Sequence, residues 1–149
     1  MRIGVGVLLV VAMSVGVAAC GGPVDTSSKD RLTTVNLNPP EGSRLSEDSN
    51  IEADLAYSIS DFEPEKYFVI SQVKTIGDDG KTYDGDYPDS LYPKLTQAEG
   101  TVHFSFPVRY VWKGASTQHP LVVWFHVVKS VGPTTSKVVA VAGPFHYSE

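Results

Sequence analysis

Two kinds of side chain in this sequence could do chemistry on their own, one cysteine and four histidines. A cysteine thiolate is a strong nucleophile, and neutral imidazole is a common ligand of transition metals. Cys20 has no second cysteine with which to form a disulfide or bind a metal. Because His103 and His126 both fall on predicted strands, they could meet on one face if those strands pair. The spacings of the histidines nevertheless fit no short metal-binding motif, and we expect no metal site; they are His103, His119, His126 and His146.

A further candidate is a stretch in which carboxylates alternate with tyrosines. Calcium prefers six to eight oxygen ligands, which such a loop can supply. Exposed tyrosines give rigid contact area that suits recognition of a protein or a sugar. The structural alternative is that Asp and Gly form turns while the tyrosines pack over an open end of the domain. We expect no bound cofactor, with calcium as the one alternative. The residues of this candidate binding loop are Asp78, Asp79, Tyr83, Asp84, Asp86, Tyr87 and Tyr92.

Short catalytic motifs are missing from the sequence. It has no Gly-x-Ser-x-Gly nucleophile turn, no His-Glu-x-x-His zinc motif and no glycine-rich phosphate loop. A site assembled from distant residues would leave no such trace, so a hydrolase with an unrecognised site stays as the third alternative. We therefore expect a protein that is not an enzyme.

The N-terminus accounts for the lone cysteine. Arg2 gives a short cationic start, residues 3–17 form an uncharged apolar segment, and Val17-Ala18-Ala19-Cys20 ends it. These last four residues resemble the lipobox of bacterial lipoproteins, with Val17 at the position where leucine is most usual. The resemblance implies cleavage between Ala19 and Cys20 and attachment of diacylglyceryl to the Cys20 sulfur. Two or more acyl chains hold a protein durably on a membrane.

A lipoprotein of this kind is expected in the bacterial cell envelope. Gly21, rather than an aspartate, follows Cys20, which favours the outer membrane if the cell is Gram-negative. Two alternatives stay open. Residues 3–19 could be a permanent membrane helix, although they fall short of the ~20 strongly apolar residues that a span needs. An ordinary signal peptidase could also cut after Ala19 and leave Cys20 free.

Composition limits the partners of the mature chain. The formal net charge of the full 149 residues is −5, which argues against nucleic acid as a partner, because phosphate binding needs clustered cations. With 42% hydrophobic and 10% aromatic residues, the chain can bury a core. We divide it into a signal peptide at residues 1–19, a lipidated N-terminus and flexible tether at residues 20–33, and one domain at residues 34–149.

Within the domain, apolar and polar residues alternate in short runs separated by turn residues, and no long run has the helical period. The clearest alternation is at residues 51–60. A longer one at 102–112 is expected to be the main core strand, bent or at a sheet edge at Pro107. Residues 121–128 are apolar on both faces apart from His126, which is typical of a central strand. The other expected strands are at 34–38, 67–76, 81–83 and 138–142.

About seven short strands without helices predict an all-β domain, with two sheets packed face to face as a single β-sandwich. Asn38-Pro39-Pro40-Glu41-Gly42-Ser43, followed by the strand from Ile51, resembles the start of bacterial immunoglobulin-like or fibronectin type III-like modules. The alternation places Phe104 and Phe106 on one face of their strand, and we expect both to be buried together with Trp124. His103 should point the other way.

These observations lead to three functional hypotheses. The first is a lipid-anchored, non-catalytic envelope protein that binds another envelope protein or joins an assembly. The second is an envelope module that binds a small ligand, a sugar or calcium through residues 78–92. The third is the unrecognised hydrolase.

Overall fold

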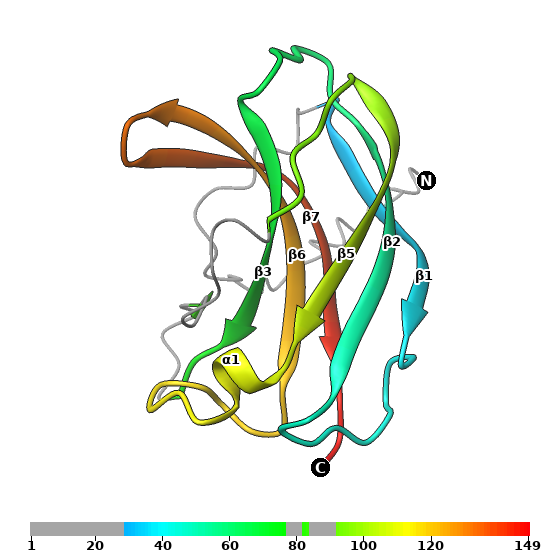
Figure 1. Ribbon diagram of the computed structural model, residues 1–149, viewed down its shortest axis with the longest axis vertical. Coiled ribbons are helices and arrows are strands. Elements are labelled where there is room, and N and C mark those ends of the chain that lie inside the picture. Colours follow the sequence, from blue (N-terminus) through cyan, green and yellow to red (C-terminus); the bar gives the residue numbers. More distant parts are fainter. Residues whose placement is uncertain (1–28, 77–81, 84–91) are drawn as a thin grey trace, which may run out of the picture.

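The computed structural model describes residues 29–76, 82–83 and 92–149 of the chain. This part of the chain is mostly β-strand, in two antiparallel sheets, with one four-residue helix (Figure 1). The prediction of an all-β fold is therefore confirmed. The elements are β1 (Arg31–Asn38), β2 (Asn50–Ser58), β3 (Tyr67–Lys74), β4 (Thr82–Tyr83), β5 (Glu99–Pro107), α1 (Arg109–Trp112), β6 (Val122–Gly132) and β7 (Thr135–His146).

The first sheet has the strand order β1-β2-β5 in the described residues. Its central strand, β2, shows the predicted alternation, with Ile51, Ala53 and Leu55 fully buried and the intervening residues partly exposed. One face of β2 therefore belongs to the core and the other faces solvent, as period-2 alternation requires. β5 lies at the edge of this sheet, which confirms the expectation drawn from Pro107.

The second sheet has the order β4-β3-β6-β7 in the same part of the chain. β6 pairs with β3 on one side and with β7 on the other, so it is an internal strand. Val127 and Val128, which are neighbours in sequence, have 0% and 1% of their surface exposed. Because successive side chains of a strand point to opposite faces, both faces of β6 are covered here, as the sequence predicted.

Side chains from both sheets meet in one buried cluster. Phe104 of β5 contacts Phe125 of β6 edge to face, with ring centroids 5.5 Å apart, and Phe106 is fully buried. The expectation that Trp124 joins the two β5 phenylalanines is wrong. Trp124 is only half-buried and lies outside the cluster, because its neighbour Phe125 takes the inward position on β6. Trp112, by contrast, is packed against the cluster.

The predicted strand at residues 102–112 is too long. β5 ends at Pro107, and the chain then turns into the four-residue helix α1. Proline has no N–H to donate to a sheet, which favours the end of a strand there. Val108 and Val111 are both fully buried, and a spacing of three residues places them on one side of a helical turn, whereas in a strand they would point to opposite faces.

The first strand also begins earlier than predicted. β1 begins at Arg31 rather than at residue 34, and Leu32 is buried, so three residues assigned to the tether belong to the first sheet. Just before β1, the carboxylate of Asp30 accepts hydrogen bonds from the backbone N–H and the hydroxyl of Ser60, at 2.7 and 2.8 Å. No helix in the described residues is long and apolar enough to cross a membrane.

Candidate functional site

The outer face of the first sheet carries a row of polar side chains. Alternation turns Glu52 and Asp54 of β2 and His103 and Ser105 of β5 away from the core. The register places Asp54 directly opposite His103, and Glu52 directly opposite Ser105. Directly opposite residues have their Cβ atoms close enough for side chains to interact. We call these four residues the polar row.

His103 lies between two carboxylates of the polar row. Its Nδ1 is 2.8 Å from Asp54 Oδ1, and its Nε2 is 2.7 Å from Glu52 Oε2. Hydrogen bonding to Asp54, joined by Glu52, raises the pKa of His103 above its usual value. The same contact, helped by a hydrogen bond from Asn36, lowers the pKa of Asp54. The arrangement favours an imidazolium ion that donates its Nδ1–H to Asp54 and forms an ion pair with Glu52.

Ser105 joins the polar row through Glu52 and Asn50. Its hydroxyl donates to Glu52 Oε1 at 3.0 Å, and it accepts a hydrogen bond from the Asn50 amide at 2.9 Å. In a serine hydrolase, a histidine takes the proton from the nucleophilic hydroxyl. Both nitrogens of His103 are instead held by carboxylates, so the polar row has the geometry of a cross-strand hydrogen-bond network.

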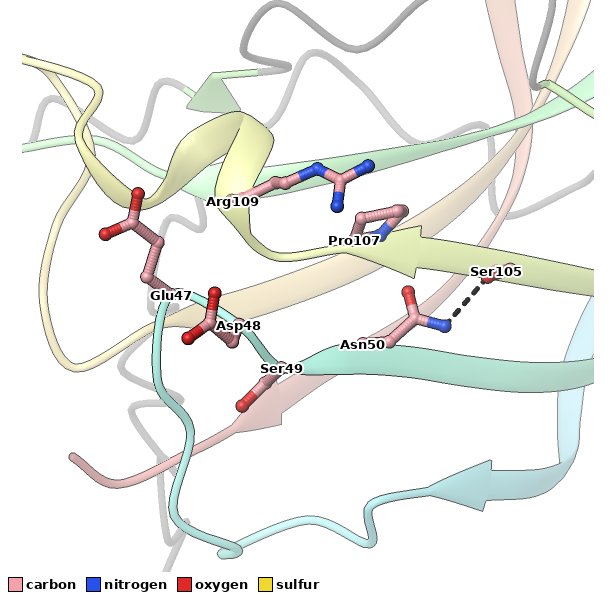
Figure 2. Close-up of a pocket in the computed structure, with 7 residues that line it drawn as sticks. All are labelled: Glu47, Asp48, Ser49, Asn50, Ser105, Pro107 and Arg109. Carbon is pink, nitrogen blue, oxygen red and sulfur yellow. Dashed lines mark hydrogen bonds between the residues drawn. The ribbon is translucent and has the colours of Figure 1, made fainter.

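The polar row leads into a small open pocket of about 220 Å³ at the Pro107 end of β5. Figure 2 shows the Asn50 side chain reaching across from β2 to Ser105, which joins the pocket to the polar row. The pocket is lined by Glu47, Asp48, Ser49, Asn50, Ser105, Pro107 and Arg109. Its walls come from the segment before β2, the end of β5 and the start of α1.

Charges of both signs surround the pocket. Lys113 forms an ion pair with Glu47 at 2.7 Å, and the guanidinium of Arg109 lies 5.3 Å from the centre of the Tyr110 ring. Asp48 adds a second carboxylate. A surface with donors and acceptors of both charges suits polar contacts with a protein partner better than it suits an apolar ligand, whose pockets are mostly lined by hydrophobic side chains.

The pocket lies at the far end of the first sheet from the point where the chain enters. The register pairs Arg31, at the entry, with Ser58 at the end of β2, whereas the pocket surrounds Asn50 at its start. The nine residues of β2 separate the two ends by roughly 30 Å. Figure 1 shows the start of β1 and helix α1 at opposite ends of the molecule.

In comparisons with protein-family models, curated proteins and solved structures, the chain matches none of them.

Most of the candidate binding loop lies outside the described residues, namely Asp78, Asp79, Asp84, Asp86 and Tyr87; the same holds for Ala19 and Cys20. Tyr83 is in β4, which pairs with the end of β3. The Tyr92 ring is half-buried and stacks between Phe68 and Phe104, at centroid distances of 6.2 and 6.5 Å. This is the packing arrangement that the sequence offered as the alternative to recognition.

The histidines are spread over the fold. His103 is on the first sheet and His126 on the second, so they do not share a face. His119 contacts Glu149 and, through Nε2, the Trp112 carbonyl at 3.0 Å. Within the described residues, no group of three or more His, Cys, Asp or Glu side chains is placed to hold a metal ion.

Sequence reasoning did not select the polar row or the pocket. The outward positions of Glu52, Asp54 and His103 followed from alternation. The pairing of β2 with β5 did not, because the paired residues are far apart in the sequence: Asp54 and His103 are separated by 49 positions. The polar segment before β2 and the Arg109 side chain gave no pattern at all. Opposite charges on the solvent-facing sides of β2 and β5 are the one sequence feature that could have indicated that these strands pair.

Proposed function

We propose that this chain is a lipid-anchored, non-catalytic lipoprotein of the bacterial cell envelope that binds another envelope protein at the pocket end of its domain. The anchor would be Cys20, after removal of residues 1–19. The observation that carries the proposal is the separation of the two ends of the first sheet. Asp30 fixes the chain entry at one end, while the pocket around Asn50 lies at the other.

Anchoring and presentation fit together in this arrangement. A domain attached through the residues before Asp30 would keep its entry end near the membrane, because only eight residues lie between Cys20 and Lys29, and this segment spans at most roughly 30 Å. The pocket end would then face away from the lipid surface. Polar contacts and one arginine at that end are typical of protein interfaces.

We further propose that the two sheets form an immunoglobulin-like or fibronectin type III-like sandwich of about seven strands. Support comes from the connections, because the chain changes sheets between β2 and β3, between β4 and β5 and between β5 and β6. Greek-key sandwiches are connected in this way. Such domains serve as binding modules in many unrelated proteins, so the fold supports the proposal only through its shape.

Site-specific photocrosslinking in intact cells tests the binding proposal. A photoreactive amino acid replaces Asp48 at the pocket in one variant and Thr101 in the matched control. Both residues are exposed, and Thr101 shares the outer face of β5 with the polar row at its opposite end. We expect a discrete adduct from position 48 and none from position 101. Equal adducts at the two positions, or none at 48, would count against binding at the pocket.

A further inference from the structure

The hairpin of β6 and β7 extends beyond the rest of the second sheet, at the upper left of Figure 1. Two of the large hydrophobic side chains that the structure leaves exposed are here: Val131 with 56% of its surface exposed and Val138 with 42%. Single exposed apolar residues are common on protein surfaces and need no explanation. The position and the charge of this hairpin indicate a role for Val131 and Val138.

The hairpin lies at the end where the chain enters the domain. Ser130 donates its N–H to the Lys66 carbonyl at 2.8 Å, and Lys129 pairs with Glu63, so the hairpin is joined to the segment between β2 and β3. The start of that same segment, Ser60, is held by Asp30 just before β1. The exposed valines and the chain entry are therefore on the same side of the molecule.

The charge of the hairpin is opposite to that of the chain. The sequence contains 17 aspartates and glutamates and has a net charge of −5, yet no acidic residue occurs between residues 100 and 148. Lys137 is exposed on β7 close to the hairpin tip. The nearest carboxylate named above, Glu63, is neutralised by Lys66 as well as by Lys129. The hairpin itself therefore presents lysines and no carboxylate to an anionic surface, although Asp61 and Glu65 are exposed on the segment joined to it.

We propose that the tip of the β6–β7 hairpin rests on the lipid surface to which Cys20 is attached, with Val131 and Val138 in the headgroup region and Lys137 against anionic headgroups. This inference rests on the proposed lipid anchor. Two valines alone would bind a membrane only weakly, but an anchor within roughly 30 Å makes the contact intramolecular and raises its effective concentration. The contact would hold the pocket end away from the membrane.

The lone cysteine makes the test direct. In the lipidated full-length protein the Cys20 thiol is used in a thioether, so a cysteine introduced by Val131→Cys is the one free thiol. A maleimide-linked NBD probe is attached there, and the protein is placed in vesicles of phosphatidylethanolamine and phosphatidylglycerol that contain a doxyl-lipid quencher. Ile76→Cys is the matched control, because Ile76 is 63% exposed and lies just after β3, at the opposite end of the domain.

At position 131 we expect the NBD emission to shift to the blue and to be quenched by the doxyl lipid. At position 76 we expect neither effect. Adding Val138→Asp should reduce the quenching at position 131. A protein that floats with the vesicles but has equal emission at both positions would overturn the hairpin contact while leaving the anchor intact. Failure to float, or uptake of the probe by wild-type Cys20, would overturn the anchor and this inference with it.

Discussion

Asp54 and His103 lie directly opposite each other on β2 and β5, with Oδ1 and Nδ1 2.8 Å apart on the solvent side of the first sheet. The His103 side chain is 61% exposed, so the pair adds little to the free energy of unfolding. The pair instead affects the charge of the His103 side chain. The contact raises the pKa of His103 and so favours a positive charge among the carboxylates close to the pocket.

The first prediction concerns the ionisation of His103. Its pKa, measured by NMR titration of the imidazole protons, should lie above the usual value of 6.5, because Asp54 and Glu52 favour the charged ring. Asp54→Asn should lower this pKa. The small stabilisation from His103 should be present below pH 6.5 and be lost as the pH rises through the raised pKa. An unchanged pKa in the Asp54→Asn variant would show that the contact does not persist in solution.

The second prediction concerns His126, whose environment has the opposite effect. Burial lowers its pKa to about 4, and its Nδ1 has no hydrogen-bond partner among the described residues. The unfolded chain therefore binds the proton first, and the free energy of unfolding should fall as the pH drops from about 6.5 to about 4, by up to roughly 3 kcal/mol. Urea titrations across this range measure the slope.

Two variants test whether His126 causes this pH dependence of the free energy of unfolding. His126→Leu should flatten it, because the titrating group is removed. His146→Asn, at an exposed position of β7, should leave it unchanged. Equal slopes in wild type and His126→Leu would contradict the assignment.

The third prediction concerns the two faces of β5. Phe106 is fully buried, so Phe106→Ala should cost about 3–5 kcal/mol in the free energy of unfolding and nearly unfold the domain. His103→Ala, on the exposed face, should cost far less. Thermal melts followed by circular dichroism compare them. Similar losses in both would mean that the face assignment of β5 is incorrect.

Alternation in the sequence predicted the strands well where one face is buried. At β2 every second residue from Ile51 is in the core, so the pattern fits only a strand with one buried face. At residues 108–112 it did not, because Val108, Tyr110 and Trp112 continue the alternation past Pro107, whereas the chain forms a short helical turn that buries Val111. The choice between Trp124 and Phe125 as the inward residue of β6 failed for a related reason. Both faces of that strand are apolar, so alternation cannot tell them apart.

The candidate site depended on information that a single sequence does not contain. The polar row requires β2 and β5 to be neighbours in a register that sets Asp54 opposite His103. Nothing local to either strand specifies that neighbour, because strand order follows from how the whole core packs. The pocket also requires the segment before β2 to lie near the start of α1. The sequence pattern predicted a strand, not a helix, at the position of α1.

The fourth prediction concerns calcium and the loop at residues 78–92. A ligand that binds the folded state raises the melting temperature in proportion to its occupancy. We expect millimolar calcium to cause no shift, and Asp84→Asn with Asp86→Asn to change stability by no more than about 0.5 kcal/mol. A rise of several degrees that is removed by a chelator and absent in the double variant would instead favour a calcium-binding module.

The central claim is the lipid anchor at Cys20, and metabolic labelling with palmitate tests it most directly. The wild-type chain should incorporate the label and fractionate with membranes, because its thiol would carry acyl chains that hold it there. Cys20→Ser should incorporate none, while Ser27→Ala, a few residues further along, should label like the wild type. Label retained by Cys20→Ser, or a wild-type protein that stays unlabelled, would contradict the account.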